Sequence, residues 1–336
     1  MRSVSYRGLL AAACLLLVAL LRGSSARADV CHPTSGVSPC IDADQLWPHP
    51  GGGPYFFLGD PTTVPAGRVA LGLVGTFLDR PIGVHVASAN PSGSDIYLVD
   101  QAFDATLLFA AGITNRLELT LAAPVTVYQD GAGVAAVDGN AAPPEHTLAR
   151  DLRFGLAFAL LTRPAGGSGP ALTPRLEFTA PTGTPGNFAG ASTMVLAPSL
   201  AFSYRLGRVD LSAEVSARVR GEVPFAGAVM GSQIGAALGG SVDVLQDRWL
   251  SAGVEAFTLP TTSSQPALPE GGSARLPVPA EWIAHVSSAH FLGGRLVLSL
   301  GGGGAIPLSP NAAITSPHYR LDFAVRLTPL GEHTPR

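Results

Sequence analysis

Charged side chains recur at every second position in several segments of this sequence, and the residues between them are apolar. In 209–220, Asp210, Glu214 and Arg218 alternate with valine, leucine and alanine, and 317–328 repeats the pattern. Successive side chains on a β-strand point to opposite faces, so each segment would carry one charged face and one apolar face. Carboxylates and arginines gathered on one face could pair with one another or line an enclosed polar space.

A histidine and a serine two positions apart, His285 and Ser287, are residue types that hydrolyse acyl esters when a third group orients them. Both would share a face with Glu281, whereas an acyl ester in a membrane would meet the apolar face. The next alternating segment, 294–303, contains no asparagine that could complete such a site. We therefore expect no catalytic site and expect the protein not to be an enzyme.

Metal, cofactor and nucleic-acid chemistry lack the residues that they require. The eight histidines are dispersed and form no ligand pair. The glycine-rich run 300–307 lacks the Lys-Ser/Thr pair of a phosphate-binding loop. A net charge of −3 gives no basic field for nucleic acid. We expect no metal site, no cofactor and no nucleic-acid partner.

The elements that would position the charged side chains are β-strands, because the alternation has a period of two. The connections between them contain glycine and proline, which favour turns. Twelve segments show this pattern: 68–79, 102–112, 117–128, 151–161, 172–180, 193–205, 208–220, 230–244, 249–258, 278–289, 294–303 and 317–328.

The connections alternate between long and short along the whole series. The first, 80–101, is long, the second, 113–116, is short, and this order continues to the long connection 304–316. Long outer loops and short periplasmic turns in an even-numbered meander are typical of outer-membrane barrels. We predict an all-β fold, a transmembrane antiparallel up-and-down β-barrel of about 12 strands. Both chain ends would be periplasmic, and the last strand would close against 68–79.

The N-terminus and the composition indicate export. Residues 1–28 resemble a secretory signal peptide, with Arg2 and Arg7 before the apolar run 9–21 and an Ala-x-Ala site at 26–28. Only 13% of the residues are charged, against roughly 25% in soluble domains, and the mean hydropathy is +0.30. The outer membrane of a Gram-negative bacterium fits this composition, and a soluble secreted β-protein is the alternative.

The rest of the chain divides by its patterning. Residues 29–66 are rich in proline and glycine without periodicity, which predicts an irregular periplasmic N-terminal segment. The barrel would span 67–329, with 330–336 as a tail. In an exported protein Cys31 and Cys40 favour a disulfide, with free thiols as the alternative.

If the apolar face meets lipid, the charged face lines the barrel lumen. Arginine–carboxylate pairs could fill a narrow barrel, since buried charges must be paired, or the charges could tune the solute selectivity of a pore. Arg205 and Arg220 belong to this face. The remaining residues that we expect to line the lumen are Asp104, Glu118, Asp151, Arg153, Arg175, Glu177, Asp210, Glu214, Arg218, Asp243, Glu255, Glu281, Arg320, Asp322 and Arg326.

The sequence resembles a known family in three stretches. These are "DADQLWPHPGGGPYFFLGDPTTVPAGRVALGLVGTFLDRPI" (42–82), "LELTLAAPVTVYQDG" (117–131) and "DLRFGLAFALL" (151–161). They are similar to the N-terminal barrel region of OmpA-family outer-membrane proteins, above all those of myxobacteria. The resemblance implies a β-barrel in an outer membrane. Such proteins commonly continue into a C-terminal peptidoglycan-binding domain, which we do not expect here because the sequence ends nine residues after 317–327.

These observations predict a narrow porin-like channel for the passive passage of small polar solutes. Its partners would be outer-membrane lipid, the barrel-insertion machinery and the solutes themselves. A closed structural or adhesive barrel that acts through its extracellular loops is the alternative.

Overall fold

The structure is a computed structural model in which the first 30 residues and the last seven are not described. The expected signal peptide, 1–28, and the expected tail, 330–336, therefore lie outside the described residues. In the described ranges, no helix has the length and apolarity needed to cross a membrane. The described residues are 31, 33, 35–86, 88–89, 93–137, 139, 144–163, 167–184, 186–191, 193–245, 248–267, 273–308 and 313–329.

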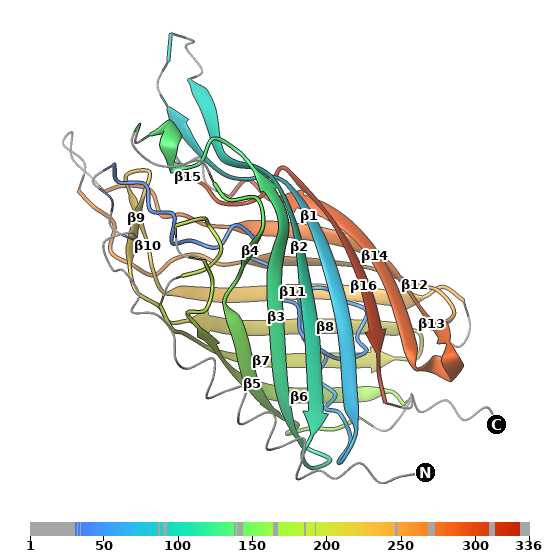
Figure 1. Ribbon diagram of the computed structural model, residues 1–336. Helices are drawn as coiled ribbons and strands as arrows, with labels where there is room; N and C mark the ends of the chain where they lie inside the picture. Colours follow the sequence, from blue (N-terminus) through green and yellow to red (C-terminus); the bar gives the residue numbers. More distant parts are fainter. Residues whose placement is uncertain are drawn as a thin grey trace.

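The described chain forms a closed antiparallel barrel of 12 strands, as the alternation and the even strand count predict. Each strand pairs with its neighbours in sequence, and β1 also pairs with β16, which closes the sheet (Figure 1). The barrel strands are β1 (Val69–Val86), β2 (Ser94–Gly112), β3 (Leu117–Asp130), β5 (Leu152–Phe158), β6 (Gly169–Ala180), β7 (Val195–Leu206), β8 (Val209–Arg218), β11 (Gln233–Asp243), β12 (Ser251–Thr258), β13 (Ala280–Phe291), β14 (Leu296–Ala305) and β16 (Tyr319–Leu327).

Short elements decorate one end of this barrel. The strands β4 (Leu148–Ala149) and β15 (Ala313–Ile314) extend the pairing of β3 and β1. The hairpin of β9 (Val223–Phe225) and β10 (Ala228–Met230) forms a separate small sheet. We call this the long-loop end, and we call the opposite end, where the strands are joined by connections such as 113–116 and 207–208, the short-turn end.

The first hairpin is longer than the sequence predicts. The connection expected at 80–101 is largely strand, because β1 and β2 continue their pairing to Val86 and Ser94. The pairing shifts register between Asp79 and Ile82, where Arg80 adopts a positive φ of 51°. A local bulge of this kind accommodates Pro81 without ending the strand. The hairpin therefore projects beyond the barrel rim (Figure 1).

The outer surface of the barrel is apolar on all of its strands. In β16 the outward residues Leu321 and Phe323 are exposed, whereas Arg320 and Asp322, which alternate with them, are at most 1% exposed. Large apolar side chains are likewise exposed on β1, β8 and β14, among other strands. A continuous apolar belt of this extent is unlike the surface of a soluble protein, and it is the surface that lipid covers.

Candidate functional site in the barrel lumen

The lumen is occupied by the chain's own N-terminal segment, residues 35–66, which we call the inner segment. It begins at the long-loop end, where Val37 bridges to Phe225, and it reaches the short-turn end, where Ala66 bridges to Gly112. Figure 1 shows its blue trace passing inside the barrel. The sequence predicts an irregular periplasmic segment at 29–66; its described residues are irregular and lie inside the barrel.

Three wall glutamates accept hydrogen bonds from the backbone of the inner segment. Glu255 accepts the N–H groups of Phe56, Phe57 and Leu58 at 2.7, 3.1 and 3.0 Å. Glu214 accepts the N–H of Gly59 at 2.9 Å. Farther along, Glu118 accepts the N–H of Val64 at 2.6 Å. An irregular chain cannot satisfy its own backbone donors, so these carboxylates take the place of a neighbouring strand.

Wall arginines donate to the backbone carbonyls of the same segment. Arg326 donates to the carbonyls of Gly53 and Tyr55 at 2.9 and 3.0 Å. Arg175 donates to the carbonyl of Asp60. Glycine at position 59 leaves room for this contact, because a Cβ there would lie 2.1 Å from the Arg175 guanidinium and displace it. The charged lumen thus provides both hydrogen-bond donors and hydrogen-bond acceptors for the inner segment.

The part of the inner segment nearer the long-loop end is held by ion pairs between its side chains and the wall. Asp44 and the wall residues Glu281 and Asp322 surround Arg320 at 3.0, 2.6 and 3.1 Å. Arg320 is fully buried, so its charge is compensated entirely by these carboxylates.

A second ion-pair group lies near the long-loop end. Arg150 donates to Asp104 at 2.5 Å and also to Asp42 of the inner segment. Thr126 donates to the same Asp104 at 2.6 Å. Sequence reasoning missed Arg150 because it lies in a connection rather than in an alternating strand.

Aromatic side chains add further contacts between the inner segment and the wall. The Trp47 ring lies 4.0 Å from the guanidinium carbon of Arg218 and 5.1 Å from that of Arg153. The ring of Phe57 stacks on Phe257 with centroids 4.1 Å apart. The Trp47 contacts are cation–π interactions, which are strongest where water is excluded.

An apolar cluster closes the long-loop end above these contacts. It joins Ile41 of the inner segment to Leu98 of β2, Phe188 and Phe225. Within the cluster, Cys31 and Cys40 form a disulfide with Cα atoms 5.3 Å apart. This end of the lumen is filled with apolar side chains rather than with water.

The opposite end of the lumen contains a polar cavity of about 440 Å³. Backbone and side chains of 51–65 form one side, and Asp210, Asp243 and Arg205 lie on the wall. Arg205 pairs with Asp243, and Arg163 lies 3.3 Å from Asp210. Residues of the short turns, including Asn115, also line the cavity, so it opens toward the short-turn end.

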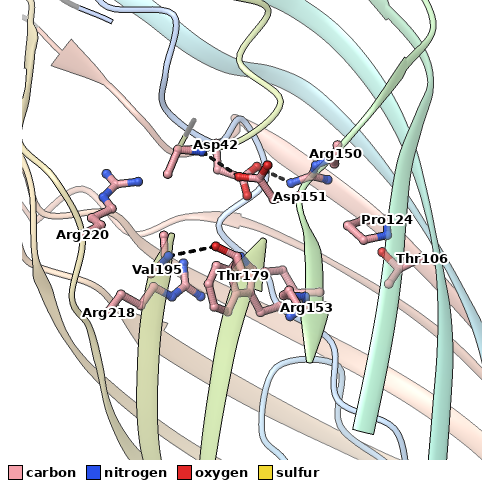
Figure 2. A pocket seen from close by; sticks show the side chains of 13 residues that line it. Asp42, Thr106, Pro124, Arg150, Asp151, Arg153, Thr179, Val195, Arg218 and Arg220 are labelled. Atoms are coloured by element: carbon pink, nitrogen blue, oxygen red, sulfur yellow. Dashed lines mark hydrogen bonds and ion pairs between the residues drawn. The ribbon is translucent and has the colours of Figure 1, made fainter. Parts of the chain in front are cut away.

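A second cavity of about 30 Å³ lies beside Trp47. Figure 2 shows that Arg153, Arg218 and Arg220 approach it from the wall, with Asp42 and Asp151 on the other side. Asp151 accepts hydrogen bonds from the N–H groups of Gly183 and Ala191 at 2.9 and 3.0 Å.

All of the residues that the sequence assigns to the lumen lie on inward positions of the wall. Asp210, Asp243, Arg205 and Arg220 are half-buried. The buried members are Asp104, Glu118, Asp151, Arg153, Arg175, Glu177, Glu214, Arg218, Glu255, Glu281, Arg320, Asp322 and Arg326. Sequence reasoning missed the inner segment as the partner of these wall residues. Most of the contacts between the two join positions far apart in the sequence, such as Phe56 and Glu255, which are 199 positions apart.

The serine–histidine pair forms no hydrogen-bonded unit. His285 is buried against the rings of Tyr55 and Phe56, at centroid distances of 5.4 and 6.3 Å. Within the described part of the chain, neither ring nitrogen of His285 has a hydrogen-bond partner. The described residues also contain no group of three or more histidine, cysteine or acidic side chains suited to a metal ion.

Comparisons with solved structures agree with the barrel fold. A COG4313 outer membrane channel from Pseudomonas putida F1 is 14% identical, with 80% of this chain and 98% of that chain covered and a TM-score of 0.57. The NanC porin is 6% identical, with coverage of 77% and 100% and a TM-score of 0.46. The KdgM porin is 9% identical, with coverage of 78% and 99% and a TM-score of 0.43. At 14% identity, the likeness to the COG4313 channel establishes the fold alone.

Sequence comparisons return no relative. No family model matches the sequence, and no curated protein matches it. The resemblance to the OmpA family therefore stays a prediction.

Proposed function

We propose that this protein is an outer-membrane channel for the passive passage of small polar solutes, with its own inner segment occupying the lumen. The observation that carries the proposal is the polar cavity of about 440 Å³, which opens at the short-turn end inside a closed, lipid-facing barrel. Its walls carry paired charges, such as Arg205 with Asp243, and hydroxyl groups such as Ser212. Such a lining replaces the hydration of a polar solute.

The inner segment limits what could pass. The cavity ends against Tyr55 and Gly59, and beyond these residues the lumen is packed with Phe56, Phe57 and Leu58. A solute must therefore be small, or the segment must shift from the wall. The similar Pseudomonas putida F1 protein, described as an outer membrane channel, supports the general assignment to outer-membrane channels.

Conductance of residues 29–336 in planar bilayers tests this function. We expect small, discrete conductance steps, and larger or more frequent openings for Glu255→Gln, which weakens the hold on Phe56–Leu58. Val254→Ala is the matched control, because Val254 is the outward neighbour of Glu255. If neither the wild type nor Glu255→Gln conducts across many insertions, and glycine causes no liposome swelling, the channel proposal fails.

A closed structural barrel is the second candidate. The apolar cluster around Ile41, Phe188 and Phe225 favours it, because it packs apolar side chains of the described residues across the long-loop end. If this candidate is right, fractionation should still recover the protein in the outer membrane. Neither the wild type nor Glu255→Gln should then conduct in planar bilayers. Loss of envelope integrity on deletion of the gene would then support the structural role.

A further inference from the structure

Three arginines around the smaller cavity have no acidic partner. Arg153 of β5, Arg218 of β8 and Arg220 directly after β8 all line the cavity beside Trp47 (Figure 2). Among the described residues, none of them lies within 4.0 Å of a carboxylate oxygen. By contrast, Arg150 and Arg320 pair with two or more acids each.

The hydrogen bonds of these arginines leave donors unused. Arg153 donates one bond to the carbonyl of Pro48, and Arg218 donates one to the carbonyl of Gln45. Arg220 donates through Nε to the carbonyl of Gly231 at 3.0 Å. In the described structure, Nε and Nη1 of Arg153 and Nη2 of Arg220 are buried without any partner. Buried donors of a charged group are rarely left unsatisfied, because the loss of hydration is costly.

The two acids on the cavity are already engaged elsewhere. Asp42 pairs with Arg150 and accepts the N–H of Asp44 at 3.1 Å. Asp151 accepts the N–H groups of Gly183 and Ala191. The Trp47 ring offers Arg153 and Arg218 only the weaker attraction of a π face. Glu177, which pairs with His49, attracts Arg153 only from beyond 4.0 Å. The cavity thus concentrates positive charge that the described residues compensate only in part.

The size of the cavity restricts the ligand. A cavity needs roughly 10–15 Å³ to hold one water molecule, so a volume of about 30 Å³ has room for only one or two particles of that size. A sugar acid or a phosphate ester is too large. A monatomic anion fits the space, supplies the missing charge and accepts several N–H bonds at once.

We propose that Arg153, Arg218 and Arg220 form a buried binding site for one small inorganic anion of chloride size, where the inner segment meets the wall. The bound anion would offset part of the positive charge of the three guanidinium groups and accept N–H bonds that they leave unused. It would thereby join β5 and β8 to the segment at Trp47. The site is independent of whether the lumen conducts.

Bromide provides a direct test on residues 29–336 in detergent. Crystals grown with sodium bromide in place of chloride should show an anomalous peak in the cavity. The peak should be lost in Arg153→Gln/Arg218→Gln and retained in Arg116→Gln, which removes a charge from an exposed short turn. A cavity that holds only water in the wild-type bromide crystals overturns the proposal.

Thermal unfolding gives a readout in solution that also covers a variant that fails to crystallise. Chloride should raise the Tm in a saturable manner relative to gluconate at the same ionic strength. The shift should vanish in Arg220→Gln and persist in Arg116→Gln. An equal response to both salts, or an unchanged chloride response in Arg220→Gln, contradicts the site.

Discussion

The two halves of the inner segment are held in the barrel by different means. Residues 42–49 contribute charged and aromatic side chains, of which Asp44 pairs with Arg320 and Trp47 contacts Arg218. Residues 51–66 are held through their backbone groups, which Glu255 and other wall residues bind, and through buried apolar side chains such as Phe56 and Phe57. Ion pairs with the wall therefore distinguish the first half, and hydrogen bonds that wall carboxylates accept from the backbone distinguish the second half.

Removing the charge of Arg320 should have the largest effect. Arg320→Met leaves Asp44, Glu281 and Asp322 buried together without a cation, at a cost of about 3–5 kcal/mol. The Tm in detergent measures this loss of stability. The difference in gel mobility between heated and unheated samples shows whether the barrel is still folded. Arg320→Lys keeps a charge and should lose less. Equal stability of the methionine variant and the wild type would show that Asp44 does not need the ion pair.

Glu255→Gln should release the second half of the segment without unfolding the barrel. One amide oxygen replaces a carboxylate that accepts three N–H bonds, for a loss of about 1.5–3 kcal/mol. Hydrogen exchange at Phe56, Phe57 and Leu58 should accelerate about 10-fold or more. Exchange at Asp44 and Leu46 should change little. Uniform acceleration over both halves would contradict the division.

Trp47→Leu should loosen the first half by a smaller amount. It removes two cation–π contacts, with Arg153 and Arg218, worth about 1–2 kcal/mol together. The Tm should fall, and protease cleavage near Gln45 should become easier. Trp47→Phe keeps a π face and should retain part of the stability. If its Tm equals that of Trp47→Leu, packing rather than the cation–π interaction holds Trp47.

Thr63→Ala should have the smallest effect. The Thr63 side chain is half-buried in the second half and donates a 3.3 Å hydrogen bond to the carbonyl of Asn115. Its loss should cost less than about 0.5 kcal/mol. The Tm and the exchange rates at Phe56–Leu58 should match those of the wild type. A large change would mean that side chains, and not the backbone alone, fix this half.

The barrel could be predicted from the sequence because its period is local. In β16 the alternation of Arg320 and Asp322 with Leu321 and Phe323 assigns each side chain to a face without knowledge of its partners. The predicted closure of the last strand on the first is confirmed by the pairing of Leu327 with Leu71.

The inner segment could not be predicted in the same way. Its hydrogen bonds are made by backbone groups, which every sequence carries, and the residue that binds Phe56 is 199 positions away at Glu255. The proline- and glycine-rich composition of 47–54 indicates only that no strand forms there. One signal was present: the predicted lumen face carries ten acids and seven arginines, so at least three acids needed a partner other than these arginines.

The seam between β1 and β16 has a consequence for assembly. Residues 71–79 pair with 319–327, so the ring closes only when the last strand meets the first. The inner segment directly precedes β1, and its far end carries the loop tied by Cys31 and Cys40 and anchored among apolar side chains. The earliest described residues must therefore be enclosed by a wall completed by the latest ones, and the barrel is assembled around its own beginning.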